Sequence, residues 1–410
     1  MRKNSIVQKE YELECLSPVH IGSGETLKAF EYLYDKGQET AYFLDEAKWI
    51  AFLEQHQLMD AFARYLETVS RALEKKSPYK GQYVWEWLRE KGITNEKIRS
   101  LGIRQAKAVA DTMQGKKDNL NDIACQISMT DGRPYLPGSS LKGAMRTGIL
   151  YHLLQENTTL KKTCWQKVKA ELGKEDDKGR SINFKQQKKD WGMIVQNLEN
   201  DLLGQLQSPH VDERRKKLTP QVKSVMRGLI VSDAVCDSGQ ETIILKKIDA
   251  SEYVDITRMK EKTLPLSREC IPAGAKFRFR VAMDQAMLQE IGIRDANEIW
   301  EMCHEFVSFG LDIQKKVFGG DYEKEFQEAY EANLMLGGGT GFLSKSLLYA
   351  LAPSEKEARD VVKYYLSRAF RQHRHEELDQ QISPRTLKLT RTRKSSSLMG
   401  LCRVCEAGKC

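Results

Sequence analysis

The segment from Pro137 to Arg146, with the sequence PGSSLKGAMR, has the residue types and spacing of an anion-binding helix start. A turn signal leads into two hydroxyl side chains, and a helical pattern of apolar residues follows directly. Lys142 and Arg146 are four residues apart, so a helix places both cations on one face. We expect Ser139 or Ser140 to cap this helix, whose free N–H groups and positive dipole end would lie near the two cations. The pattern therefore suits a phosphate, although an ordinary capped helix has the same pattern.

Two further segments, at residues 22–24 and 337–341, have the composition of glycine-rich phosphate-binding loops. Glycines let a backbone approach a phosphate closely and turn its N–H groups toward it. The second segment is not a nucleotide P-loop, because Ser344 rather than glycine stands directly before Lys345. It also lacks the dinucleotide fingerprint, because Phe342 stands where the last glycine belongs. A tight turn between two helices is the alternative for this segment.

Few residues of this chain have the pattern of a catalytic or metal site. Metal-free RNA cleavage needs a general base near a Lys or Arg, and His20 is the best-placed candidate, with a loop-shaping histidine as the alternative. Asp233 follows a predicted strand, but a single carboxylate makes a poor magnesium site. Cys402 and Cys405 have the spacing of part of a zinc knuckle, whereas tetrahedral zinc needs four ligands. We therefore expect no metal and no cofactor, with Cys402 buried in the core.

Composition indicates the class of protein that carries these segments. The 410 residues are enough for two or three domains, and the formal net charge of +8 is a modest basic excess whose distribution matters more than its total. Aromatic residues make up only 8%, so the composition does not indicate a platform for base stacking. The nine cysteines form no disulfide framework and indicate reduced thiols. No signal peptide and no membrane-spanning apolar run is visible, so we expect a cytoplasmic protein without a membrane partner.

Strands and helices alternate in the first half of the chain. Residues 6–16 alternate polar and apolar side chains, which predicts a half-buried strand. Residues 155–226 are polar and Lys-rich and are expected to form a charged helical arm or a partly mobile segment. The other expected elements here are strands at 29–34, 41–44 and 123–129, helices over about 45–113, and the helix that starts in the 137–146 segment.

The second half predicts an α+β continuation. Residues 383–405 contain no acidic residue and six cations, so we expect a basic tail there. The other expected elements are strands at 229–234, 242–248 and 276–281, and helices at 285–332, 346–351 and 355–379. The order predicts an α+β protein built on ferredoxin-like units, with large helical insertions. The expected division is a first unit at 1–154 with a helical insertion at about 45–113, an arm at 155–226, and a second unit at 227–410 with the glycine-rich loop and basic tail.

Four motifs, in this order, give the chain a family resemblance. The sequences SPVHIGSG at 17–24, YLPGSSLKG at 135–143, VSD at 231–233 and LGGGTG at 336–341 resemble the RAMP superfamily of CRISPR-associated proteins. The sequences PRTLK at 384–388 and MGLC at 399–402 narrow the resemblance to the family that supplies the fifth subunit of the type III-A Csm complex. The resemblance runs from residue 6 to about residue 405.

The resemblance implies RRM-like, ferredoxin-like folds, CRISPR RNA as the ligand and neighbouring Csm subunits as partners. Such a subunit is expected near the 3′ end of the guide RNA, where it ends the backbone filament and influences maturation, so host trimming nucleases are further candidate partners. No loop here matches that of the target-cutting subunit, so we do not transfer cleavage to Asp233. The RNA contacts that we predict are His20, Gly22, Ser23, Gly24, Gly138, Ser139, Ser140, Lys142, Arg146, Gly337, Gly338, Gly339, Thr340 and Gly341.

Three functions remain open at this point. The first is a non-catalytic RNA-binding subunit that holds phosphates without reading bases, as a guide of variable sequence requires. The second is a metal-independent endoribonuclease that processes the guide RNA, with His20 as the general base. The third is an adaptor whose residues 155–226 dock a neighbouring subunit or a trimming nuclease.

Overall fold

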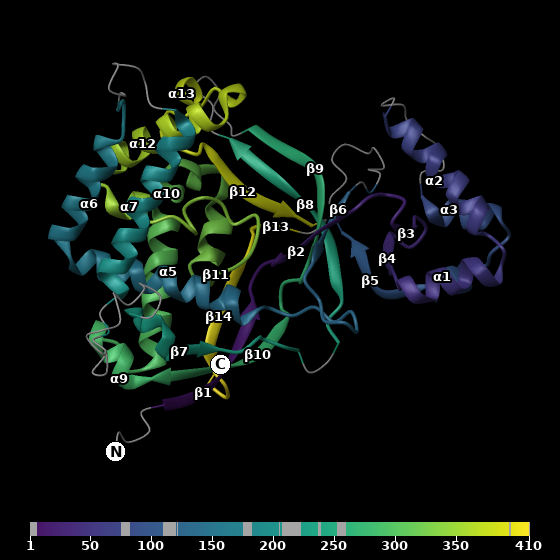
Figure 1. Ribbon diagram of the computed structural model, residues 1–410, viewed down its shortest axis with the longest axis horizontal. Coiled ribbons are helices and arrows are strands. Elements are labelled where there is room, and N and C mark those ends of the chain that lie inside the picture. Colours follow the sequence, from purple (N-terminus) through teal and green to yellow (C-terminus); the bar gives the residue numbers. More distant parts are fainter. Residues whose placement is uncertain are drawn as a thin grey trace, which may run out of the picture.

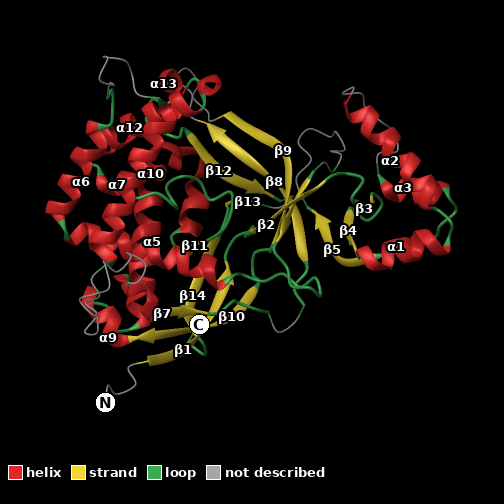
Figure 2. Ribbon diagram, in the orientation of Figure 1, coloured by secondary structure: helices red, strands yellow, loops and turns green. Residues whose placement is uncertain are grey.

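The computed structural model has a mixed α+β fold built on two β-sheets, as the sequence predicts (Figures 1 and 2). The predicted ferredoxin-like units and their boundaries stay a prediction. The structure describes residues 6–74, 83–109, 120, 122–174, 183–204, 206, 223–236, 239–251, 260–392 and 395–409. Parts of the predicted insertion and arm, at 75–82, 110–119, 175–182 and 207–222, lie outside these residues.

The first sheet joins the two ends of the chain. Its strand order is β11-β14-β1-β10-β7, and β1 pairs antiparallel with both β10 and β14. The alternation that predicts β1 is confirmed, because Tyr11, Leu13 and Cys15 are buried while the glutamates between them are not. The strands are β1 (Ile6–Cys15), β7 (Leu229–Val231), β10 (Lys276–Asp284), β11 (Leu334–Met335) and β14 (Leu401–Glu406).

The second sheet also draws strands from both ends of the chain. Its order is β2-β6-β9-β8-β5-β4-β3, and β12 pairs with β8 and with β13. The predicted 1–154 and 227–410 segments are thus interwoven in both sheets. The strands are β2 (Gly22–Leu27), β3 (Tyr32–Asp35), β4 (Thr40–Leu44), β5 (Gly102–Ala108), β6 (Ile123–Gln126), β8 (Thr242–Ser251), β9 (Lys260–Cys270), β12 (Thr386–Arg391) and β13 (Ser396–Leu398).

The long helices α5 and α10 form the main helical layer. Trp300 of α10 packs edge-on against Tyr11 of β1, with ring centroids 5.3 Å apart. Helix α5 approaches α10 closely because Gly148 has no side chain, and a Cβ there would lie 2.8 Å from the Sγ of Cys303. The buried side chains of α6 and α7 belong to the same core. The helices of this layer are α5 (Gly138–Glu156), α6 (Thr158–Ala170), α7 (Phe184–Leu203), α9 (Gln285–Leu288), α10 (Ala296–Ala329), α11 (Leu348–Leu351), α12 (Glu355–Ala369) and α13 (His375–Leu378).

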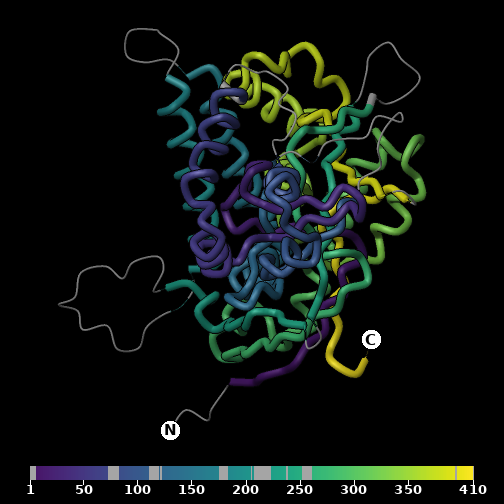
Figure 3. Tube along the Cα trace, turned by 90° about the vertical axis from the view of Figure 1, so that its right-hand side faces the viewer, coloured from purple at the N-terminus to yellow at the C-terminus, as the bar shows by residue number. Residues whose placement is uncertain are grey.

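A separate helical lobe lies beyond β3, β4 and β5 and faces the viewer in Figure 3. Apolar side chains form the core of this lobe, where Trp49, Phe52, Trp85 and Trp87 are buried together. These aromatic side chains are therefore structural rather than a surface for stacking bases. The lobe comprises α1 (Glu46–Gln55), α2 (Met59–Glu74), α3 (Val84–Glu90) and α4 (Asn95–Arg99).

Three predictions of local structure are wrong. Residues 22–24 form the start of strand β2, paired with β6, rather than a loop. The predicted helices do not extend to residue 113, because β5 occupies 102–108, where it pairs with β4 on one side and β8 on the other. The helix predicted over 355–379 is interrupted after Ala369, where Phe370 and Arg374 leave helical geometry, Arg374 with a positive φ of 51°.

Residues 386–406 of the predicted basic tail supply three strands of the two sheets. Two of its cations pair with carboxylates from distant segments, since Arg391 lies 2.7 Å from Glu261 and Arg403 lies 2.8 Å from Glu14. Apolar residues alternate along these strands in the sequence, but the prediction rested on the net charge of the segment and so missed the strands. The prediction missed β9, whose sequence KEKTLPLSREC is too polar to predict a strand.

Candidate RNA-binding site

Segments that are far apart in the sequence meet at a cluster that we call the glycine junction, formed by His20, Gly22 and residues 337–341. The N–H of Gly338 donates to the carbonyl oxygen of His20 at 2.7 Å. The turn that contains Gly400 holds the other side, since Gly400 N–H donates to Pro18 O at 2.9 Å and its own carbonyl accepts from Leu336. The structure thus brings the predicted glycine-rich segments at 22–24 and 337–341 together.

Close packing dictates the glycines of this loop. Gly337 has a φ of +82°, and a Cβ there would lie 2.1 Å from the carbonyl oxygen of His20. Gly339 has a φ of +90°, and its Cβ would lie 2.8 Å from the Sδ of Met399. No larger residue fits either position without moving backbone or core. The loop follows strand β11, so the alternative of a turn between two helices is wrong.

Polar contacts fix the rest of the loop. Thr340 is buried, and its hydroxyl donates to Gly337 O at 3.3 Å while accepting from Ser344 at 2.8 Å. The Lys345 ammonium also donates to Gly337 O, at 2.6 Å, and its burial lowers the pKa of this lysine. Sequence analysis used Lys345 only to exclude a P-loop and missed its role in holding the loop.

His20 lies inside the junction, with 6% of its surface exposed. Its Nδ1 is 2.7 Å from the carbonyl oxygen of Glu269, so the neutral ring carries its proton there and leaves Nε2 beside Gly22. Burial lowers the pKa of His20; the hydrogen bond to Glu269 opposes this effect, and the charge of Arg268 adds to it. A general base must reach the proton that it removes, so this geometry favours the loop-shaping alternative.

A buried carboxylate behind His20 was missed in the sequence. Glu269 of β9 is fully buried, and its two oxygens accept from Nε and Nη2 of Arg104 at 3.0 and 2.9 Å. They also accept from Gln126 N–H (3.0 Å) and the Thr242 hydroxyl (2.8 Å). This network ties β5, β6, β8 and β9 together behind the junction. Only the strand pairing reveals it, because Arg104 and Glu269 are far apart in the sequence.

The entrance of α5 differs from its prediction. The helix begins at Gly138, with Pro137 as the N-cap residue, and Ser139 and Ser140 lie inside it and do not cap it. Instead, Asp233 caps from a distance, because its carboxylate accepts from Gly138 N–H at 2.7 Å. Gly138 packs so tightly that a Cβ would lie 2.3 Å from Val231 O. The carboxylate of Asp233 occupies the helix start where we expected a phosphate.

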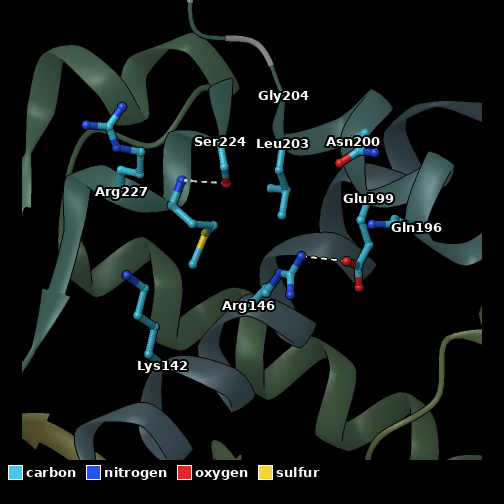
Figure 4. Close-up of a pocket in the computed structure, with 10 residues that line it drawn as sticks. Lys142, Arg146, Gln196, Glu199, Asn200, Leu203, Gly204, Ser224 and Arg227 are labelled. Carbon is cyan, nitrogen blue, oxygen red and sulfur yellow. Dashed lines mark hydrogen bonds and ion pairs between the residues drawn. The ribbon is translucent and has the colours of Figure 1, made fainter. Parts of the chain in front are cut away.

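The two predicted cations of α5 instead line a pocket of about 280 Å³ between α5 and α7. Figure 4 shows Lys142 and Arg146 on α5, with Arg146 facing Glu199 of α7. The Lys142 ammonium donates to Leu229 O at 2.6 Å, and burial lowers its pKa, with a further contribution from Arg146. Arg146 pairs with Glu199 at 2.5 Å. Among the described residues that line the pocket, Lys142, Arg146 and Arg227 are cationic and Glu199 is acidic, a balance that favours an anion.

The remaining predicted contacts lie on β2. Ser23 and Gly24 are exposed there, next to an irregularity in the pairing of β2 with β6. Gln126 of β6 links this region to the segment just before α5, because its side chain accepts from Ile21 N–H (2.8 Å) and donates to Tyr135 O (3.4 Å). The predicted residues therefore lie in two places. One is the glycine junction with β2, the other is α5 with its pocket, and the buried side chain of Gln126 lies between them.

The described residues contain neither a metal-ligand cluster nor a membrane-spanning helix. No group of three or more His, Cys, Asp or Glu side chains among them could hold a metal ion. Cys402 is fully buried, as expected from the sequence. No helix in the described part of the chain has the length and apolar character needed to cross a bilayer.

Comparison with known proteins identifies the family. The model of the RAMP superfamily matches residues 12–344. The chain belongs to the RAMP superfamily. Among curated relatives named "CRISPR system Cms protein Csm5", that of Mycobacterium tuberculosis is 24% identical over 405 residues, covering 96% of each chain. That of Enterococcus italicus is 22% identical over 380 residues, covering 89% of this chain and 87% of the relative. The resemblance stated from the motifs is thus confirmed.

Two solved structures share the fold of this RAMP chain. One is a chain of a "Csm-crRNA-target RNA ternary complex in type III-A CRISPR-Cas system", with a TM-score of 0.63, 20% identity and coverage of 97% of this chain and 100% of the other. The other is Csm5 of T. onnurineus, with a TM-score of 0.55, 20% identity and coverage of 96% and 99%.

Proposed function

We propose that this chain is the Csm5-type subunit of a type III-A CRISPR interference complex, where it binds CRISPR RNA and neighbouring Csm subunits without cleaving RNA itself. The observation that carries the proposal is the match to relatives named Csm5 along nearly the whole of both chains, up to 96% of each. The fold agrees with that of a chain from a Csm–crRNA complex. The cations that line the α5 pocket, beside the closely packed backbone of the glycine junction, are of the kind that such a role needs.

We further propose that the chain ends the RAMP filament at the 3′ end of the guide and supports guide maturation and antiviral defence. A subunit there holds a spacer of variable sequence, so it must contact phosphates rather than base edges. The glycine junction suits this task because its shape depends on packing and exposes no aromatic platform. Trimming nucleases would then meet the guide beside this subunit.

The α5 pocket provides a direct test. In a reconstituted complex that contains the full chain, Lys142→Ala with Arg146→Ala should weaken guide retention and make it less dependent on salt, because fewer phosphates are neutralised. A matched control removes two exposed lysines of α10, Lys316 and Lys324, which have their own carboxylate partners. Equal guide occupancy and equal salt dependence in the two double variants would contradict a phosphate-binding pocket.

The endoribonuclease alternative makes the opposite prediction about His20. If the chain cleaves guide RNA without metal, the purified protein should cut in the presence of a chelator, and His20→Ala should abolish the cut. We expect no His20-dependent cleavage, because the ring is buried and its Nδ1 is bonded to the backbone. Specific, chelator-resistant cleavage that His20→Ala removes would replace our proposal with the nuclease function.

A further inference from the structure

Strands β8 and β12 present a charged face beside the glycine junction. In their antiparallel pairing Lys388 lies directly opposite Asp249, and Lys247 lies two residues from Asp249 on the same strand. Side chains two residues apart point to the same face of a strand, so these three groups share one face. The alternate residues Leu387 and Leu389 are fully buried in the core. The strand register therefore gathers two lysines around one carboxylate.

The charges on this face do not balance. The ammonium groups of Lys388 and Lys247 lie 3.0 and 3.1 Å from the same oxygen of Asp249, Oδ1. The three side chains are 20%, 13% and 18% exposed, so water screens them only in part. The register of β9 adds the exposed Lys262 opposite Asp249. Counted over the described residues of these three strands, one carboxylate on this face has three lysines around it, which favours the arrival of an anion.

Burial on this face changes the pKa of Lys388. Burial, together with the charge of Lys247, lowers the pKa of Lys388 to about 8, and Asp249 opposes both effects. A bound anion would act in the same direction as Asp249 and favour the charged ammonium. Negative charge placed beside Lys388 would therefore raise its pKa again and favour the ammonium form.

The position of the lysines connects them to the predicted RNA site. The Cγ of Lys388 lies 3.5 Å from where a Cβ of Gly341 would be, so the lysine stem packs on the last glycine of the junction. On the other side of the same loop, Lys345 donates to Gly337 O. Lys388 donates to the Thr386 hydroxyl at 2.6 Å, which leaves further N–H donors on its ammonium. A strand of RNA that follows the glycine loop would pass this pair.

We propose that Lys247 and Lys388, which we call the lysine pair, bind one internal phosphodiester of single-stranded RNA at the rim of the glycine junction. The inference rests on the proposed RNA-binding function and adds a contact that the sequence motifs do not contain. Since both ammonium groups lie within about 3 Å of one oxygen of Asp249, they are close enough for one phosphate to accept from both. Asp249 holds the two lysines at this spacing before RNA arrives.

The test measures RNA binding to the full purified chain. A fluorescent, mixed-sequence single-stranded RNA is titrated between about 50 and 200 mM salt with the wild type, the double variant Lys247→Gln/Lys388→Gln, and the control Lys316→Gln/Lys324→Gln. We expect the lysine-pair variant to bind about tenfold more weakly. Its slope of log affinity against log salt should fall by about 0.7, the value of one lost phosphate on a single strand. The control removes the same charge and should stay within about twofold of the wild type.

Two further variants keep the result decisive. Lys247→Arg/Lys388→Arg preserves both charges and should restore most of the affinity, whereas a purely structural role of the lysines would not distinguish Arg from Gln. If circular dichroism shows that the double Gln variant does not fold, the single variant Lys388→Gln should still lower the affinity about threefold.

The outcomes separate this inference from the proposed function. A lysine-pair variant that matches the α10 control, in a chain that binds RNA, overturns the lysine pair and leaves the proposed function standing. A wild-type chain that does not bind single-stranded RNA at all overturns both. A tenfold loss with the expected change of slope, absent from the control, supports the lysine pair.

Discussion

The α5 pocket and the lysine pair show two ways to place two cations together. On α5, Lys142 and Arg146 are one helical turn apart, and each has its own partner, the carbonyl of Leu229 and the carboxylate of Glu199. On β8 and β12, Lys247 and Lys388 share a single oxygen of Asp249. The α5 cations were visible in the sequence, but the structure shows that Arg146 has a carboxylate of its own, whereas Lys142 donates to an uncharged carbonyl. The capacity of a site to hold a phosphate therefore depends on the partners of its cations rather than on their number.

The largest expected effect is on the free energy of unfolding, from a substitution in the buried Glu269 network that joins β8 to its neighbouring strands. Glu269→Gln would leave Arg104 without a counter-charge in a buried network, and we expect the free energy of unfolding to fall by about 3–5 kcal/mol. The exposed Glu241, which bonds only a side-chain amide among the contacts described, provides the control, and Glu241→Gln should change stability by less than about 0.5 kcal/mol. Chemical denaturation of both variants measures the difference. Equal stabilities would show that the Glu269 network does not hold β5, β6, β8 and β9 together.

A glycine substitution disturbs the α5 pocket alone. Gly138→Ala would place a Cβ against Val231 O and Ser232, so we expect a loss of about 1–3 kcal/mol as the start of α5 moves away from β7. Gly143 lies in the same helix with no atom near its Cβ position, and Gly143→Ala should stabilise the chain by up to about 1 kcal/mol.

Thermal unfolding compares the two glycine variants, and RNA titration compares the two cation sites. In Gly138→Ala the contribution of Lys142 and Arg146 to RNA affinity should fall, while Lys247→Gln/Lys388→Gln should still cost about tenfold in that background. If the lysine-pair effect also disappeared, the two sites would not be independent.

Removing the partner of Arg146 should make the two sites more alike. Glu199→Gln leaves one cation of the α5 pocket without its carboxylate, so we expect RNA affinity to rise severalfold and the salt slope to steepen by about 0.7. Glu328→Gln on α10 removes an equally negative group from an exposed pair with Lys324 and serves as the control. Anisotropy titrations check both variants. A rise of the same size in the control would assign the effect to net charge rather than to Arg146.

The smallest expected effect concerns pH and the glycine junction. The pKa of His20 lies below its usual value of 6.5 in the folded chain, so the unfolded chain binds the proton more readily. The contribution of neutral His20 to stability is complete above about pH 6.5 and is lost as the pH falls toward the folded pKa. Thermal unfolding between pH 5 and 7.5 should show a shallower loss in His20→Gln than in the wild type. An identical pH dependence would mean that His20 titrates as an exposed histidine.

The sequence predicted the parts of the fold that depend on local pattern. The alternation of β1, the start of α5 near residue 138 and the glycine loop after residue 336 are all present. The site residues on one helix, Lys142 and Arg146, also share a pocket as their spacing predicts. These features follow from side-chain periodicity over fewer than about ten residues.

Features that depend on strand pairing could not be predicted in this way. Asp233 caps α5 in place of Ser139 or Ser140, because β7 lies against the helix start. The cations of residues 383–405 suggested a basic tail, because the partners of Arg391 and Arg403, which are Glu261 and Glu14, lie more than a hundred residues away in the sequence. Lys247 and Lys388 become neighbours only through the register of β8 and β12.

Mapping the peptides that UV light crosslinks to guide RNA in the assembled complex tests the central claim most directly. The account predicts adducts within residues 336–346, beside the glycine loop, and within 384–392 and 139–147, which carry the cations of the two sites. Crosslinks confined to the helical lobe of α1 to α4, with none at these three segments, would contradict it.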